Sequence, residues 1–315
     1  MWLDNYIFDE LDACHAPSGP LREFDVTLAI DEPMLQRYLG TYFPRSYTET
    51  FIIFENLFSS PHISASLSQN KILSIASLGV GTGGDLLGLL DSIANHFLAV
   101  EEVNVYALDG NSESIKLCAS IVTEAQKHLP FVVNFECNLY QFDSLCSVDN
   151  LPPFLYEPYD FIITSKMLNE IISSKDKRFA RPYYDFCRLM LPRLSTFGLC
   201  LILDVTAKPR GEERFVPQIM NEQISEAVRD MPFYRSLLPI KCSQHERECV
   251  EGCFTSMSFF VSHSGKLYAE CKVSYRVIAW KEYVDRIALD RNDEILKGVQ
   301  RSNLGASDNM LLYSR

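Results

Sequence analysis

The sequence predicts an α/β fold in which a mainly parallel sheet carries helices on both faces. Three observations lead to this prediction. Apolar, β-prone stretches alternate with stretches of helical periodicity, and this alternation is typical of parallel sheets with right-handed crossovers. The strand stretches are almost continuously apolar, as are strands buried on both faces. A glycine-rich turn joins the first of these strands to a helix.

The chain is predicted to begin with a helical extension. Residues 1–30 are acidic and mixed in character, and we expect an arm or short helices there. A helix is predicted from Asp31, where a carboxylate cap precedes Pro33 in the first turn. Pro44 is expected to break this helix, because proline lacks a backbone donor. A second helix is predicted over 46–57, which has an apolar side.

The stretch 72–90, ILSIASLGVGTGGDLLGLL, is the centre of the predicted fold. A strand over 72–78 precedes a leucine-rich helix, and four glycines lie between them: Gly79, Gly81, Gly83 and Gly84. Glycine allows a sharp bend and a close approach to a ligand, and the helix N-terminus offers free N–H groups. Strand, glycine turn and helix together are typical of the first unit of a nucleotide-binding sheet.

Further strands and helices follow in order. Strands are predicted over 103–108, 131–137, 159–165 and 197–205, and helices over 112–128, from Met167, and over 215–238. The runs 253–263 and 267–280 are predicted to form an antiparallel hairpin at the sheet edge, with a turn at Gly265. We therefore expect a helical extension over 1–70, a main domain over 71–285 and a polar tail over 286–315.

Composition limits the possible classes of protein. The chain has 315 residues, 47% of them hydrophobic and 22% charged, as in soluble globular proteins. A formal net charge of −12 argues against non-specific nucleic-acid binding. No apolar run approaches the length of a membrane span. The first ten residues lack the apolar core of a signal peptide, so we expect a cytoplasmic protein whose ten cysteines are reduced thiols or metal ligands.

The glycine turn fits two ligand-binding patterns. Gly79-x-Gly81-x-x-Gly84 fits the dinucleotide fingerprint, so one alternative is an NAD(P)-dependent oxidoreductase. Gly79-x-Gly81-x-Gly83, within LGVGTGGDLLGLL, resembles the first motif of class I S-adenosylmethionine-dependent methyltransferases. This resemblance covers residues 70–280. It implies a Rossmann-like fold, S-adenosylmethionine as cofactor, methyltransferase activity, and an antiparallel hairpin after five α/β units.

The resemblance also implies roles for residues near the strand ends, where open α/β sheets bind ligands. Ser77 stands where many of these enzymes have an acidic residue near the methionine amino group, and Asp85 is the candidate substitute. Asp109, past the second strand, is predicted to accept the ribose hydroxyls, or else is only a turn residue. Asn138 is the candidate for adenine recognition, with Asp143 as its competitor.

The stretch after the fourth strand is predicted to face the cofactor and the substrate. Ser165 is assigned to the cofactor, and Lys166 and Asn169 to the methyl acceptor. Glu170, or Asp204 at the end of the fifth strand, is the candidate general base, which is required only if the acceptor must lose a proton. Alternatively, Asn169 and Glu170 stabilise the helix dipole, and Asp204 caps a loop.

A cysteine cluster forms a candidate metal site late in the chain. Four possible soft ligands lie within 12 residues: Cys242, His245, Cys249 and Cys253. Such a set could hold zinc or an iron–sulfur cluster. The spacing lacks a Cys-x-x-Cys pair, and the alternative is that these are ordinary thiols.

The chain also resembles a family of ribosomal small-subunit-associated methyltransferase-like proteins. The matching segments are Tyr38-Leu39-x-x-Tyr42-Phe43-Pro44-x-x-Tyr47, Leu168-Asn169-Glu170 and the cysteine cluster, with spacings that differ from that family's pattern. The third alternative is a non-catalytic binding or assembly factor, which the absence of an acidic residue at Ser77 favours. The acceptor, whether small molecule, protein or RNA, and the oligomeric state are not determined by the sequence.

Overall fold

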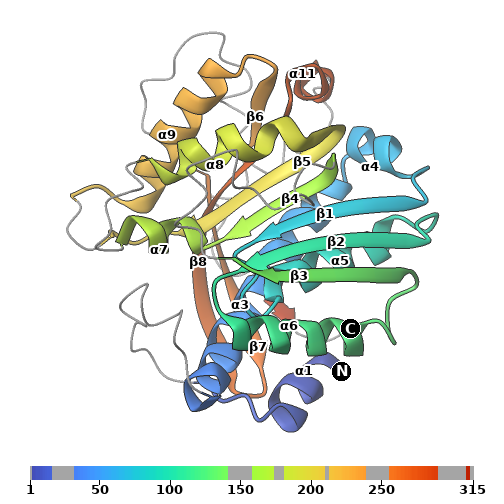
Figure 1. The fold of residues 1–315 in the computed structure, drawn as a ribbon, viewed down its shortest axis with the longest axis vertical. Helices are drawn as coiled ribbons and strands as arrows, with labels where there is room; N and C mark the ends of the chain where they lie inside the picture. Colours follow the sequence, from blue (N-terminus) through green and yellow to red (C-terminus); the bar gives the residue numbers. More distant parts are fainter. Residues whose placement is uncertain are drawn as a thin grey trace.

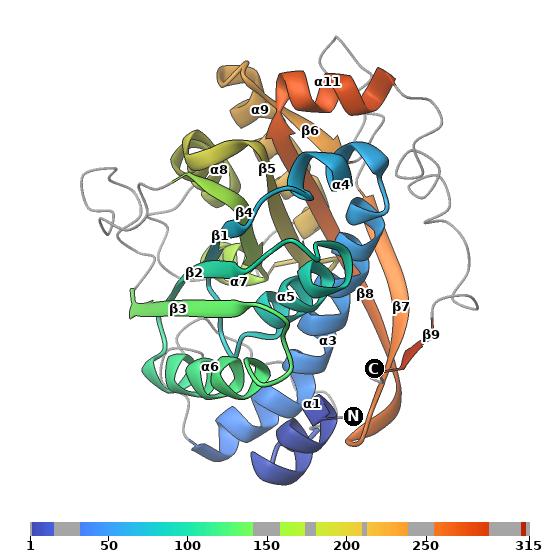
Figure 2. The same ribbon diagram turned by 90° about the vertical axis from the view of Figure 1, so that its right-hand side faces the viewer.

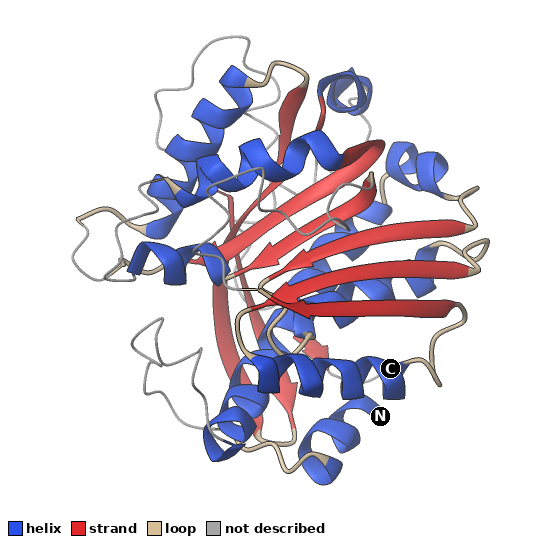
Figure 3. Cartoon of the chain, viewed as in Figure 1, coloured by secondary structure: helices blue, strands red, loops and turns tan. Residues whose placement is uncertain are grey.

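The computed structural model describes residues 2–15, 32–140, 158–173, 181–209, 213–238, 255–289 and 310–312. These residues form one mixed sheet with helices against both faces (Figure 1), which confirms the predicted α/β, Rossmann-like class. Buried apolar side chains form two clusters, one on each face of the sheet. Figure 3 shows the same layers by type of element, with the strands between the helices.

The first half of the sheet is parallel, in the order β3-β2-β1-β4-β5. Its strands are β1 (Ile72–Leu78), β2 (Glu102–Asp109), β3 (Val132–Leu139), β4 (Tyr159–Ser165) and β5 (Leu194–Val205). Leu78 pairs with Leu108 on one side and with Thr164 on the other, so the carboxyl ends of β1, β2 and β4 meet at one edge. The chain order reverses between β1 and β4, and open α/β sheets bind ligands at such a point.

The second half of the sheet is antiparallel and centres on β8 (Lys266–Trp280). This strand pairs with β5 on one side and with β6 (Tyr234–Leu238) and β7 (Thr255–His263) on the other. The predicted hairpin of β7 and β8 is therefore present beyond β5, toward the end of the sheet, with β8 as its inner strand. Figure 2 shows the two strands as a long ribbon beside α3. A short strand, β9 (Met310–Leu312), pairs with β7.

The helices divide between the two faces. The first face carries α3 (Glu32–Phe58), α4 (Pro61–Leu67), α5 (Gly84–His96), α6 (Ser112–Ala125), α11 (Lys281–Leu289) and the N-terminal α1 (Trp2–Asn5) and η1 (Tyr6–Glu10). The second face carries α7 (Met167–Ser173), α8 (Pro182–Met190), η5 (Leu191–Arg193) and α9 (Val216–Asp230). None of the helices described is long and apolar enough to cross a lipid bilayer.

The predicted break at Pro44 is wrong, because α3 runs through it as one helix of 27 residues. Proline leaves the carbonyl four residues earlier, here that of Gly40, without its helical donor. The imidazole of His15 hydrogen-bonds to the backbone of Gly40, and so satisfies that group from outside the helix. The carbonyl of Pro44 in turn accepts the Thr48 hydroxyl at 2.8 Å.

The predicted helix over 215–238 is also only partly correct. The helix α9 ends at Asp230, and β6 follows. Pro232 lies between them and cannot continue a helix, while β8 offers β6 a partner for strand pairing. The predicted boundary between the main domain and the tail, after residue 285, falls within the helix α11. The three-part division at 70 and 285 stays a prediction.

Candidate functional site

The turn between β1 and α5 consists of glycines in conformations that other residues rarely adopt. Gly79, Gly81 and Gly83 have φ values of 72°, 52° and 86°, in the left-handed region that favours glycine. A Cβ on Gly79 would lie 2.6 Å from the Cβ of Met167, and one on Gly83 would lie 2.6 Å from the Sγ of Cys118. The backbone therefore bends where no side chain fits, at the edge where the parallel strands end.

A cavity of about 250 Å³ lies at this edge. The glycine turn, the end of β2, the start of α7 and one side of α3 enclose it. The predicted site residues that line it are Gly79, Gly81, Asp85, Asp109, Ser165, Lys166, Asn169 and Glu170. The fold thus brings together side chains from separate parts of the chain.

Asp109 ends β2 and holds the glycine turn. Its Oδ2 accepts a hydrogen bond from the Gly81 N–H at 2.7 Å, and its Oδ1 accepts one from the Asn111 N–H at 2.8 Å. Burial raises the pKa of the Asp109 carboxyl, and these amides act in the opposite direction. Each carboxylate oxygen has a second lone pair, so Asp109 keeps the capacity to accept hydroxyl donors.

Asp85, in the first turn of α5, is only 3% exposed. Its Oδ1 accepts the Leu86 N–H at 2.9 Å, whereas Oδ2 has no hydrogen-bond partner among the described residues. Burial raises the pKa of this carboxyl to about 7, although the Leu86 amide and Lys166 act in the opposite direction. A buried, incompletely paired carboxylate of this kind is suited to a cationic ligand group.

Ser77 does not take part in the cavity. It is fully buried within β1, where it pairs with Ala107 and Ile163 of the neighbouring strands. Its hydroxyl has no hydrogen-bond partner in the part of the chain that the structure describes. Asp85, the residue that the sequence offers as a substitute, lines the cavity in its place.

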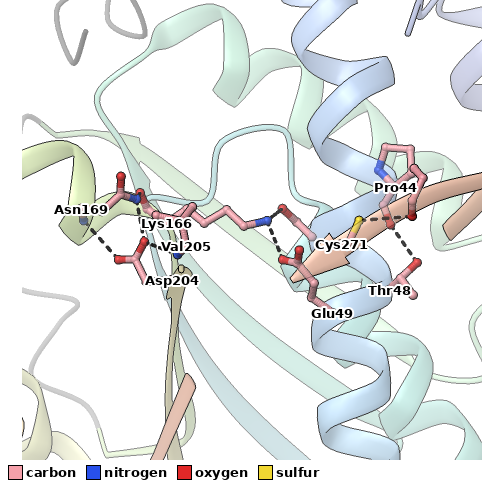
Figure 4. Close-up of polar contacts among 10 residues, drawn as sticks. Pro44, Thr48, Glu49, Lys166, Asn169, Asp204, Val205 and Cys271 are labelled. Atoms are coloured by element: carbon pink, nitrogen blue, oxygen red, sulfur yellow. Dashed lines mark hydrogen bonds and ion pairs between the residues drawn. The ribbon is translucent and has the colours of Figure 1, made fainter. Parts of the chain in front are cut away.

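Lys166 turns the chain from β4 into α7. Its φ of 62° is unusual for a residue with a side chain, and its N–H donates to the Leu203 carbonyl at 2.8 Å. The Nζ lies 2.5 Å from the Oε2 of Glu49 and 3.4 Å from the Oγ of Ser46, both on α3. Figure 4 shows the lysine side chain extended toward Glu49. This ion pair fastens the start of α7 to α3.

Asp204 caps the start of α7 and does not line the cavity. Its carboxylate accepts hydrogen bonds from the Asn169 Nδ2 at 2.6 Å, the Asn169 N–H at 3.1 Å, the Tyr183 hydroxyl at 2.8 Å and the Val205 N–H at 2.7 Å. Burial raises the pKa of Asp204 to about 6, against these donors. The side chain does not line the cavity, which agrees with the alternative that it is a cap. Figure 4 shows Asp204 beneath Asn169.

The cap fixes the orientation of the Asn169 amide. The Nδ2 also donates to the Lys166 carbonyl at 2.5 Å, so both of its protons are used within the protein. The Oδ1 is the polar atom of Asn169 that is left for a ligand, as a hydrogen-bond acceptor. Glu170 and Ser165 also line the cavity, and the buried Ser165 Oγ has no partner among the described residues.

Asn138 lies away from the cavity. The strand β3 extends to Leu139, so Asn138 is inside a strand rather than beyond it. Its Nδ2 donates to Glu136 at 3.2 Å, on the same side of the strand. The competing candidate, Asp143, lies outside the described residues.

The structure gives no metal centre in the described residues. No group of three or more His, Cys, Asp or Glu side chains is arranged there to hold a metal ion. The four predicted ligands, Cys242, His245, Cys249 and Cys253, lie outside the described residues.

The sequence pattern predicts no site role for α3, yet this helix forms a wall of the cavity. Tyr38, Tyr42 and Ser46 line it, at the four-residue spacing that places side chains on one face of a helix. The rings of Tyr38 and Tyr42 are 4.9 Å apart, and burial raises the pKa of Tyr38, with Glu170 contributing. The spacing is visible in the sequence, but the predicted break at Pro44 divides it between two helices.

Comparison with known proteins assigns no family to the chain. No sequence profile of a known family matches it, and no curated protein sequence matches it. TrmN from Thermus thermophilus is similar at a TM-score of 0.36 and 12% identity, over 69% of this chain and 47% of that chain. The plantazolicin methyltransferase BpumL in complex with SAH is similar at a TM-score of 0.45 and 13% identity, over 89% and 99% of the two chains. An rRNA methylase from Streptococcus thermophilus has a TM-score of 0.38, 13% identity, and 73% and 96% coverage. These values describe a weak similarity, which concerns the fold alone.

Proposed function

We propose that this chain binds S-adenosylmethionine in the cavity and is a class I methyltransferase. The observation that carries the proposal is the placement of Asp109 and Asp85 beside the glycine turn, at the edge where the sheet order reverses. Among the described residues, three carboxylates line the cavity, those of Asp85, Asp109 and Glu170, against one lysine that is already paired with Glu49. This excess of negative charge suits a ligand with a net positive charge.

Two of the lining carboxylates suit groups of this cofactor. S-adenosylmethionine carries an ammonium, a carboxylate and two ribose hydroxyls, and when bound it supplies a methyl group activated by a sulfonium. We assign the hydroxyls to Asp109 and the ammonium to Asp85, whose Oδ2 has no partner among the described residues. The bend at Gly79 and Gly81 lets the backbone approach the ligand without a Cβ in the way.

The chain then contributes orientation and exclusion of water rather than covalent chemistry. Tyr38 and Tyr42 close the cavity from α3. The Asn169 Oδ1 accepts a hydrogen bond from the N–H or O–H of the methyl acceptor, and Glu170 takes the proton if the acceptor must lose one. Asp204 acts as a positioning residue, because it holds the Asn169 amide without reaching the cavity.

The antiparallel strand β8 beside β5 argues against the alternative of an NAD(P)-dependent oxidoreductase. A dinucleotide-binding sheet continues at this place with a second parallel half. The class of acceptor is left open by the proposal. A cytoplasmic location and weak non-specific nucleic-acid binding stay predictions from the sequence.

Calorimetric titration of the protein with S-adenosylmethionine, S-adenosylhomocysteine and NAD tests the proposal. We expect the first two ligands to bind and NAD not to bind. Asp109→Ala should weaken both affinities by about 10–100-fold, because the variant loses the hydrogen bonds from the ribose hydroxyls to a charged carboxylate. Asp185→Ala, on α8 and outside the cavity lining, is the matched control. Binding of none of the three would favour the non-catalytic alternative, and a Kd unchanged in Asp109→Ala would contradict the assigned site.

A further inference from the structure

Lys166 carries the one cationic side chain that lines the cavity in the described part of the chain. The proposed cofactor carries one anionic group, a carboxylate, at its amino-acid end. That group cannot lie favourably against Asp85, Asp109 or Glu170, because like charges in a partly desolvated site repel each other. The part of the cavity that Lys166 lines is therefore the most favourable place for this group among the described residues.

The position of Lys166 is fixed by several contacts. Its N–H is bonded to Leu203, its carbonyl accepts from Asn169, and its Nζ is held by Glu49 and Ser46 (Figure 4). The Glu49 side chain is 2% exposed and that of Lys166 is 18% exposed. The ammonium has three donors, and the two contacts to α3 account for two of them. This leaves the ammonium one further donor, and Lys166 lines the cavity.

On the basis of the function proposed above, we propose that Lys166 binds the carboxylate of the cofactor's amino-acid end, rather than the methyl acceptor. Glu49 has the role of a positioning residue, since it keeps the ammonium charged and directed across the cavity from α3. The ammonium of the ligand then meets Asp85 and the carboxylate meets Lys166, so that both charges of the amino acid are matched. The helix α3, which precedes the glycine turn in the chain, is thereby part of cofactor recognition.

Decarboxylated S-adenosylmethionine provides the test, because it keeps the sulfonium, the ammonium and the nucleoside and lacks only the carboxylate. Calorimetric affinities for this compound and for S-adenosylmethionine are compared in the wild type, Lys166→Met, Lys166→Arg and Lys208→Met. Lys208 lies over the ring of Phe215 and does not line the cavity, so its variant is the control.

We expect Lys166→Met to weaken S-adenosylmethionine binding by about 10–100-fold and to leave the decarboxylated compound within about twofold of the wild type. Lys166→Arg should lose less, and Lys208→Met should change neither affinity. Retained binding of the decarboxylated compound also shows that the variant is folded. If Lys166→Met weakened the binding of both ligands equally, or of neither, the inference would be overturned. The role of Lys166 would then be limited to its ion pair with Glu49, between α7 and α3. Failure of the wild type to bind either ligand would overturn the proposed function instead.

Discussion

Asp85 shows how one side chain can connect ligand binding to proton binding. Its pKa of about 7 results from burial without a full set of partners, and a cation beside it would favour the ionised form. The protein must therefore release a proton from Asp85 when it binds a cationic ligand near or below neutral pH. This linkage gives the binding affinity a predictable dependence on pH.

We expect the affinity for S-adenosylmethionine to rise as the pH increases toward 7 and to level off above it. Below pH 7 the carboxyl is mostly protonated, and ionising it costs about 1.4 kcal/mol, or tenfold in affinity, per pH unit. Calorimetry between pH 5.5 and about 8.5 measures this slope. Asp85→Asn should bind weakly at every pH and lose the slope, whereas the same slope in Asp85→Asn would show that another group is responsible.

The sequence identifies those site residues whose placement is decided locally. Gly79 and Asp109 each follow directly from a strand end, and both lie at the cavity. Asn138 also follows a predicted strand end, but β3 continues past it and its amide turns to Glu136. The predicted strand ends at 137 and β3 ends at Leu139, so a side chain expected beyond the strand lies within it, because the sequence does not locate strand ends to within two residues.

Two glycines of α5 determine how closely α3 approaches. A Cβ on Gly84 would lie 2.6 Å from the Phe43 carbonyl oxygen, and one on Gly88 would lie 2.4 Å from that of Tyr47. The backbones of the two helices are therefore in contact at both positions. This contact places Tyr38 and Tyr42 over the cavity, so the packing of the two helices is a condition for the site.

Gly88→Ala is expected to destabilise the protein, although glycine to alanine in a helix ordinarily stabilises it by about 1 kcal/mol. The new methyl group would overlap backbone atoms of α3, which cannot rotate away, and we expect a net loss of about 1–3 kcal/mol. Chemical denaturation measures the stability, and calorimetry with S-adenosylhomocysteine should show weaker binding as α3 moves outward. An increase in stability would show that the helices can separate without cost.

The continuity of α3 could not be predicted from its own residues. Pro44 is an ordinary reason to end a helix, and the compensating group is His15, which reaches the Gly40 backbone from a segment 25 positions earlier in the chain. The role of Glu49 could not be predicted for the same reason. Its partner, Lys166, lies in the turn after β4 and comes beside it only in the folded chain.

The whole molecule places several carboxyl groups in environments that favour their protonated form. Burial raises the pKa of Asp85 to about 7, and those of Asp91 and Asp204 to about 6. These groups bind protons more strongly in the folded chain than in the unfolded one, so the stability they provide is lost as the pH rises from about 4 to about 7. The pKa of His263 is lowered to about 4, and its contribution runs the other way, since it is lost as the pH falls below about 6.5.

Between pH 8 and pH 6.5 the carboxyl groups dominate. We expect the ligand-free protein to gain about 1 kcal/mol of stability over this interval, which corresponds to a rise in Tm of about 1–2 °C for a chain of 315 residues. Thermal unfolding monitored by circular dichroism measures the change, and Asp85→Asn should remove most of it. A Tm that is constant or falls toward pH 6.5 would contradict the buried, incompletely paired state of Asp85.

The parallel half of the sheet was predictable because its strands alternate with helices along the chain and pair mostly with near neighbours. The antiparallel half was predictable only as a hairpin. The sequence predicts a helix over Tyr234–Leu238 because the residues of β8 that pair with it, Val277 to Trp280, come far later in the chain. Local pattern cannot reveal a pairing that depends on a distant segment.

The central position of β8 has a consequence for synthesis on the ribosome. This strand is made after β5, β6 and β7, yet it pairs with all three. A nascent chain that has not yet delivered Lys266–Trp280 exposes an open edge of β5, and such edges are where chains associate wrongly. The parallel half can form early, but β5, β6 and β7 have no common partner until this late strand is made, and that interval is when the nascent chain is most exposed to wrong association.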